Sequence, residues 1–226
     1  MGYKKSRNTK EKIINACRRL FYENGYINTR YEDLSEATGL SPGVIHYHFQ
    51  SKKNMAGIIY DEFLTSNKAL VNQLLEEEYE LQIRTAVEIR SYMNLLLSDD
   101  KFKRFYLEIC QDRVIVDLFR ETGVYFYQLH RDEYNLDISD GMIAMINITS
   151  AAAETELIMN YFKGDRAYSF EDIVEFNIRL NYELMAIDYE KINEIVEMSR
   201  YIYDTLQVRF KDHFELDIQV VGQGGE

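Results

Sequence analysis

The stretch Gly39–Phe49 constrains the fold of this chain more than any other, because it carries the start signals of one short helix. Gly39 suits the left-handed position that ends a preceding helix. Ser41 is a favourable N-cap, and Pro42 falls at the first helical position, where its missing N–H is not needed. At about 100° per residue, one face of the helix is apolar around Ile45, and the opposite face carries no carboxylate. Such a face can enter a DNA groove without electrostatic penalty.

The segment before it predicts a partner helix. Thr29-Arg30-Tyr31-Glu32 has the pattern of a capping box with Thr29 as the cap, which predicts a helix from about Arg30 to Thr38. Two helices joined by a short turn are typical of the helix-turn-helix, whose second helix reads the major groove. An ordinary helical corner has the same topology, so the spacing alone leaves both interpretations open.

The rest of the chain also has helical spacing. A first helix is expected to begin near Asn8 or Thr9, and a fourth to run from a cap at Ser51 to about Leu75. No alternating strand pattern competes with the remaining helices, which are expected at about 79–98, 101–112, 115–134, 139–163, 169–187 and 189–213. We therefore predict an all-α fold. An N-terminal three-helix helix-turn-helix domain (1–55) precedes a larger helical ligand-binding and dimerisation domain (56–216) and a disordered tail (217–226).

Charge divides the chain in the same way. Residues 1–55 contain ten Lys and Arg and five Asp and Glu, a net charge of +5. Because the whole chain has a net charge of −12, the remaining residues carry a net charge of −17. The acidity of the whole opposes non-specific coating of nucleic acid, while the basic head keeps a local electrostatic footprint.

Enzyme and metal sites find no support in the sequence. It contains no Glu-x-x-His, no glycine-rich phosphate loop and no Gly-x-Ser-x-Gly. His130 precedes Arg131-Asp132-Glu133, which predicts a charged helix surface and not a metal site. Cys17 and Cys110 lie far apart and suggest no disulfide framework. No cofactor, catalytic residue or metal ligand is expected, and with no membrane span or secretory signal we expect a cytoplasmic protein.

Residue identities narrow the interpretation further. Several short pieces of the N-terminal sequence match the pattern of one known DNA-binding domain, with the same spacing and no gap. They are Ile13-Ile14-Asn15-Ala16, Leu20-Phe21, Asn24-Gly25-Tyr26, Asp33-Leu34, Ala37-Thr38-Gly39-Leu40-Ser41, Gly43-Val44-Ile45, His48-Phe49 and Ser51-Lys52. With these pieces, Thr9 to Met55 resembles the DNA-binding domain of TetR-family repressors. One departure is that His46 stands where the family usually has a phosphate-contacting tyrosine, with Tyr47 next to it.

The resemblance implies a homodimer on double-stranded DNA with two half-sites. The DNA-binding residues it predicts are Thr29, Arg30, Ser41, Pro42, Gly43, Val44, His46, Tyr47, His48 and Lys52. Base-edge contacts are expected from Gly43, Val44 and Tyr47. Phosphate contacts are expected from Thr29, Arg30, His46, Tyr47, His48 and Lys52. The family forms its dimer largely through late body helices, so we expect the interface among 139–163, 169–187 and 189–213.

An effector cavity is also implied, within the body. The positions expected to line it are Tyr92, Tyr106, Cys110, Phe126, Asn147, Ser150 and Glu154. Aromatic walls with a few polar groups suit a small apolar or aromatic effector. We therefore expect a homodimeric repressor that a small molecule releases from its operator. The alternative is a DNA-binding protein of the same fold whose C-terminal domain recruits a protein partner and senses no small ligand.

Overall fold

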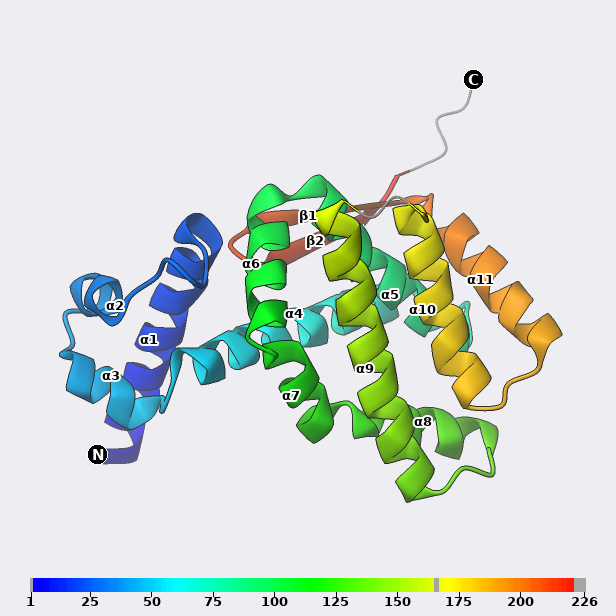
Figure 1. Cartoon of the computed structure of the whole chain (residues 1–226), viewed down its shortest axis with the longest axis horizontal. Coiled ribbons are helices and arrows are strands. Elements are labelled where there is room, and N and C mark those ends of the chain that lie inside the picture. The colour runs from blue at the N-terminus through cyan, green and yellow to red at the C-terminus, as the bar shows by residue number, and fades with distance from the viewer. Residues whose placement is uncertain (1, 165–166, 222–226) are drawn as a thin grey trace.

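A computed structural model describes residues 2–164 and 167–221, and within these ranges the chain is almost entirely helical (Figure 1). The head contains α1 (Gly2–Asn24), α2 (Tyr31–Thr38) and α3 (Pro42–His48). The body elements are α4 (Lys52–Leu75), α5 (Leu81–Ser98), α6 (Asp100–Gln111), α7 (Val114–Thr122), α8 (Val124–Tyr134), α9 (Asp140–Lys163), α10 (Phe170–Leu184), α11 (Tyr189–Tyr203), β1 (Leu206–Asp212) and β2 (Glu215–Val220). The predicted all-α class is confirmed, with one small exception at the C-terminal end.

That exception is an antiparallel hairpin of β1 and β2, where the sequence analysis was wrong. The helix expected over 189–213 ends at Tyr203, and the tail expected to be disordered from 217 begins inside β2, while residues 222–226 lie outside the described part. The register pairs Val208 with Ile218 and Phe210 with Leu216, so apolar side chains alternate with charged ones. This alternation is short enough to be taken for the end of an amphipathic helix.

Two helix boundaries also differ from expectation. The helix expected over 115–134 is divided at Gly123 into α7 and α8. A Cβ at Gly123 would clash with Asn147 Oδ1, so only glycine allows α9 to approach this closely. At the other end of the chain, α1 begins at Gly2, several residues before the expected cap near Asn8 or Thr9.

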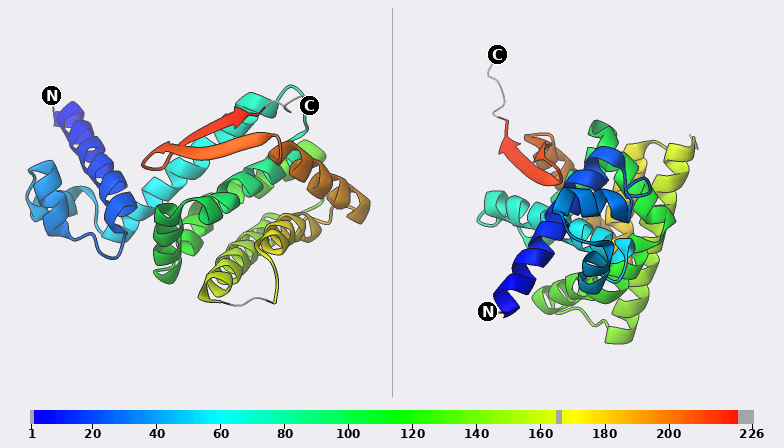
Figure 2. Two further views of the ribbon diagram at one scale, coloured as in Figure 1. Left: turned by 90° about the horizontal axis from the view of Figure 1, so that it is seen from above. Right: turned by 90° about the vertical axis from the view of Figure 1, so that its left-hand side faces the viewer.

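The long helix α4 belongs to both parts of the molecule. Its first turn is in the head core, where the Cys17 thiol lies 3.3 Å from the sulfur of Met55 and both residues are fully buried. Its remainder runs into the body, and the hairpin lies along it (Figures 1 and 2). The boundary predicted at residue 55 therefore falls within a continuous helix that can transmit movement between head and body.

Buried Arg90 on α5 organises the packing of the last two helices. Its side chain is 1% exposed, donates to Ser199 Oγ at 2.9 Å, and forms an ion pair with Glu171 at 2.5 Å. It thereby joins α5 to α10 and α11. On the other side of α10, α9 lies alongside it, and together they form the side of the body opposite the hairpin (Figure 2).

Within the described residues, α9 is long and apolar enough to cross a membrane by length and composition alone, with 44% of the tested window buried inside the fold. Part of this apolar character comes from Met142, Met145 and Ile148, which repeat every three residues and are exposed. The helix thus has one face in the core and an unpartnered apolar face outside.

Candidate nucleic-acid interface and internal cavity

The helix-turn-helix has the local geometry that its sequence predicts. Gly39 adopts φ 65° after α2, and its N–H donates to Ser35 O at 2.8 Å. Ser41 is the N-cap of α3, with its Oγ accepting from the Val44 N–H, and Pro42 is in the first turn. Ile45 is fully buried against the rest of the head, which fixes the rotation of α3 about its axis.

This rotation exposes one face of α3. Gly43, Val44, His46 and Tyr47 are all exposed, and the Tyr47 side chain is 84% exposed. The His46 ring stacks on Tyr31 of α2, with centroids 5.9 Å apart and planes within 4° of parallel. The predicted base-edge residues therefore lie together on an exposed surface without a carboxylate, and their DNA contacts stay predictions.

Thr29 does not have the environment predicted for it. It is fully buried, and its hydroxyl donates to Gly25 O at 2.7 Å, so the side chain holds the loop before α2 and is not available to a phosphate. The N-cap of α2 is Arg30, one residue later than expected, and the Arg30 N–H donates to Asp33 Oδ2 at 2.7 Å. Arg30 itself is exposed and remains a candidate phosphate contact.

Lys52 also bonds within the head. Its ammonium donates to the carbonyl oxygens of Ile27 and Thr29, both at 3.1 Å, and lies 4.6 Å from the centroid of the Tyr26 ring. Burial lowers the pKa of this ammonium. In this conformation Lys52 secures the loop between α1 and α2, and its phosphate contact stays a prediction.

Residues of α6, together with Asp112 just after it, bond to the end of α1 and to the loop that follows. Arg104 donates to the carbonyl oxygens of Tyr22 and Glu23 at 2.8 Å, satisfying acceptors at the C-terminal end of α1. The Tyr26 hydroxyl donates to Asp112 Oδ2 at 2.5 Å, and the Ile27 N–H donates to Glu108 Oε2 at 3.0 Å. These contacts join positions about 80 residues apart, and no sequence motif marks them.

The hairpin adds a further link between head and body. The Tyr22 ring contacts the rings of Phe210, His213 and Phe214 edge-on, with centroids 5.2–5.8 Å apart. The Tyr22 hydroxyl donates to Asp99 Oδ2 at the start of α6. Head orientation is therefore set by α4, α6 and the hairpin together.

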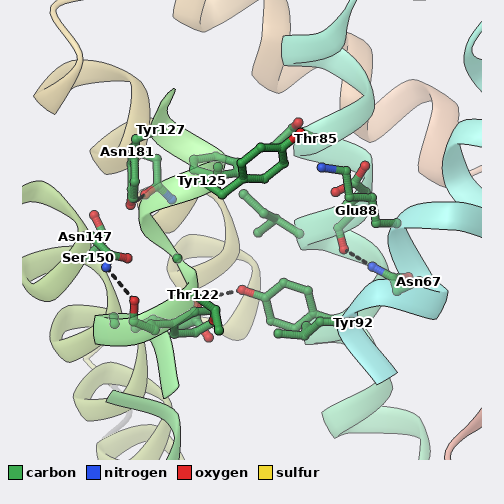
Figure 3. A pocket seen from close by; sticks show the side chains of 18 of the residues that line it. Asn67, Thr85, Glu88, Tyr92, Thr122, Tyr125, Tyr127, Asn147, Ser150 and Asn181 are labelled. Carbon is green, nitrogen blue, oxygen red and sulfur yellow. Dashed lines mark hydrogen bonds between the residues drawn. The ribbon is translucent and has the colours of Figure 1, made fainter. Parts of the chain in front are cut away.

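A cavity of about 320 Å³ lies in the body, at the small end of the roughly 300–1,000 Å³ typical of ligand sites. It is lined by residues of α4, α5, α7, α8, α9 and α10 (Figure 3). Its lining residues combine aromatic rings, hydroxyls, amides and carboxylates; they are Asp61, Leu64, Thr65, Asn67, Lys68, Thr85, Glu88, Ile89, Tyr92, Phe119, Thr122, Gly123, Tyr125, Phe126, Tyr127, Asn147, Ser150, Ala151, Glu154, Asn177 and Asn181.

Five of the seven residues predicted for this cavity line it, and they are Tyr92, Phe126, Asn147, Ser150 and Glu154. The other two, Tyr106 and Cys110, are buried but are not lining residues. Tyr106 lies behind the wall, where its hydroxyl donates to Glu154 Oε1 at 3.0 Å. Burial raises the pKa of the Cys110 thiol well above its usual range, which keeps it protonated.

Glu154 is a carboxyl group at the cavity wall with three neutral donors. Besides Tyr106, its Oε2 accepts from the Tyr92 hydroxyl at 2.5 Å and from Asn177 Nδ2 at 2.7 Å. Burial raises the pKa of Glu154, and the three hydrogen bonds oppose that rise. The network joins α5, α6, α9 and α10 around one end of the cavity.

The opposite wall carries a second acidic group. Burial raises the pKa of Glu88 to about 7, with Lys68 and Arg84 opposing the shift. Glu88 Oε1 and Asn67 Oδ1 are buried and have no hydrogen-bond partner among the described residues, and the same is true of Ser150 Oγ on α9. Buried polar atoms without partners are uncommon, so these three mark places where a bound molecule or water can bond.

His130 corrects one sequence-based expectation beside this cavity. It is 1% exposed, not part of a charged surface, and its Nδ1 lies 3.0 Å from Phe126 O. Burial lowers its pKa to about 4, so the ring is neutral at physiological pH.

An exposed, carboxylate-free recognition helix on a helix-turn-helix defines a DNA-binding protein. The comparisons agree: residues 13–57 match the model of the bacterial regulatory proteins of the tetR family. This match covers the helix-turn-helix, so the head of the chain is similar to the DNA-binding domain of transcriptional regulators of that family.

Similarity extends beyond the head. An uncharacterised HTH-type transcriptional regulator from Lactococcus lactis is 24% identical over 200 residues, covering 83% of this chain and 96% of the relative. The transcriptional repressor AcnR of Corynebacterium glutamicum is 41% identical over 51 residues, only 23% of this chain and 27% of the repressor. The crystal structure of RolR in complex with resorcinol superposes with a TM-score of 0.60 at 15% identity, covering 87% of this chain and 95% of RolR. The Lactococcus and Corynebacterium relatives are both named as transcriptional regulators.

Proposed function

We propose that this regulator is a homodimeric repressor that binds an operator through α3 of each protomer and that a small molecule in the body cavity releases it. The observation that carries the proposal is the exposed face of α3, where Gly43, Val44 and Tyr47 lie together with no acidic side chain. A glycine allows close backbone approach, and a valine can meet a thymine methyl group.

A dimer is supported by the apolar outer face of the body. Met142, Met145 and Ile148 on α9 are exposed, and so are Phe176 and Leu184 on the neighbouring α10. Two adjacent helices with such a face can pack against the same pair from a second copy around a two-fold axis. We assign the interface to α9 and α10 and not to α11, because α11 packs its apolar side on α5.

Release by a small molecule is supported by the path from the cavity to the head. Phe119 lines the cavity near the end of α7, and its carbonyl oxygen accepts from Asn147 Nδ2 at 2.6 Å. Two residues earlier on α7, Asp117 forms an ion pair with Lys53 in the first turn of α4, just after the recognition helix. A ligand that displaces α7 therefore alters the support of the head.

The cavity also favours a small ligand over a protein partner as the signal that the body receives. The RolR structure has resorcinol bound to a protein of this fold. The cellular compartment that suits a repressor of this kind is the cytoplasm.

The proposal is tested by titrating purified full-length protein against a DNA sequence selected from a random pool. Two protomers per selected site and a loss of affinity in Gly43→Ala support it. Binding of one protomer, or equal affinity for selected and scrambled DNA, contradicts it.

A further inference from the structure

Four asparagine side chains in the cavity wall use their Nδ2 donors on other groups of the protein. Asn67 Nδ2 donates to Glu88 O at 2.9 Å, which leaves Asn67 Oδ1 buried without a partner. Asn147 Nδ2 is used by Phe119 O, and Asn177 Nδ2 by Glu154. Asn181 Nδ2 likewise donates to Asn177 O at 2.9 Å, but its Oδ1 accepts from the Tyr127 hydroxyl at 2.6 Å.

The charges of the lining residues have the same bias. Among the lining residues that the structure describes, Asp61, Glu88 and Glu154 are carboxyl groups and Lys68 is the one ammonium. Glu88 Oε1 has no hydrogen-bond partner among the described residues, and Glu154 is bonded only to neutral donors. Because burial raises the pKa of both glutamates, an occupant with positive charge would favour their ionised form, whereas an anion would oppose it.

The acceptors and the aromatic rings of the lining suit a molecule with a polar end and an aromatic end. In Figure 3, Asn67 and Glu88 lie on one wall, and Asn147 and Ser150 lie across the cavity from them. Tyr92 and Tyr125 belong to the aromatic surface of the lining. Aromatic faces attract cations as well as apolar surface.

We infer that the effector is a small aromatic ammonium compound, whose cationic group meets Glu88 and Asn67 and whose ring lies among the aromatic side chains. This inference names the ligand class of the regulator and rests on the proposed function for its biological role. The cavity volume of about 320 Å³ suits a compound built on one or two rings.

Calorimetry on the full-length protein without DNA compares three probes that share a phenol ring: tyramine, 4-(2-hydroxyethyl)phenol and 4-hydroxyphenylacetate. They differ mainly in the charge at one end, which is positive, zero and negative. Tyramine should bind at least about tenfold more tightly than the neutral compound, as a charge-assisted hydrogen bond implies, and the carboxylate should bind most weakly.

Two variants of matched size assign the charge preference to its residue. Glu88→Gln keeps the shape of the side chain and should reduce tyramine affinity about tenfold while changing affinity for the neutral compound less than about twofold. Lys68→Met removes the opposing charge and should leave tyramine affinity unchanged or increase it. Equal losses for tyramine and the neutral compound in Glu88→Gln would mean that Glu88 acts by shape and would overturn the inference.

The remaining outcomes separate the inference from the proposed function. Tightest binding of 4-hydroxyphenylacetate, or no binding of tyramine, overturns the ligand class even if the protein binds its operator. Tyramine that binds in the predicted order but does not weaken operator binding supports the ligand class and contradicts release by the effector.

Discussion

Lys53 Nζ lies 2.7 Å from Asp117 Oδ2 and 2.8 Å from the carbonyl oxygen of Asp112, so the first turn of α4 is tied to the α6–α7 region. This ion pair lies between the recognition helix and a helix whose Phe119 lines the cavity. Both side chains are about one-third exposed, so water screens part of their attraction.

Loss of this ion pair should loosen the head. Asp117→Asn should weaken operator binding by about twofold to fivefold, the range expected for a partly exposed pair. It should also speed amide hydrogen exchange in the first turn of α4. Hydrogen exchange with mass spectrometry and operator titration measure the two effects. Asp100→Asn, which breaks the Lys103 ion pair within α6, is the matched control and should change neither.

Gly43 tests how closely α3 approaches DNA. A Cβ at this position would meet no protein atom within 4 Å, so Gly43→Ala should leave the melting temperature unchanged. If the backbone approaches a base pair here, the added methyl group should reduce operator affinity by about tenfold, or roughly 1.4 kcal/mol. Normal affinity in a normally folded variant would remove Gly43 from the interface.

Lys52 is predicted to act on stability and not on the number of phosphate contacts. Lys52→Met keeps most of the apolar stem and removes the two hydrogen bonds to Ile27 O and Thr29 O. Urea unfolding should show a loss of about 1 kcal/mol. The slope of the logarithm of affinity against the logarithm of salt concentration should stay the same, whereas a direct phosphate contact would lower it by about 1.

His130 gives the stability a specific pH dependence. Its folded-state pKa of about 4 lies below its ordinary 6.5. Between pH 6.5 and pH 4 the unfolded state therefore binds a proton that the folded state does not, and the folded state loses stability as the pH falls through this range. Relative to His130→Gln, the parent protein should lose about 2–3 kcal/mol of unfolding free energy between pH 7 and pH 4. Protonation of Glu88 acts in the opposite direction but is present in both proteins, so the difference isolates His130. Parallel stability curves would show that the histidine is accessible to water.

The head could be predicted from sequence because its signals are local. The left-handed Gly39, the Ser41 cap and the buried Ile45 lie within seven residues of one another and act through adjacent backbone. Val44 and Tyr47 were placed on the exposed face by helical periodicity alone.

The errors arise where distant parts of the chain compete for the same group. Thr29 was predicted to contact phosphate, but the folded loop gives its hydroxyl a backbone carbonyl acceptor. His130 was predicted on a charged surface because its neighbours are charged, yet packing of α8 buries its ring. Tyr106 is an aromatic residue with a hydroxyl, as a cavity lining often has, but it lies behind the cavity wall and bonds to Glu154.

The most direct test of this account is selection of bound sequences from a random double-stranded DNA pool with the full-length protein. The selected DNA should contain an inverted repeat whose half-site centres are separated by about 10 base pairs or a multiple of that, as two α3 helices of a two-fold dimer require. Gly43→Ala should enrich the same repeat more weakly. Enrichment of no sequence, or of a single unrepeated element, would contradict it.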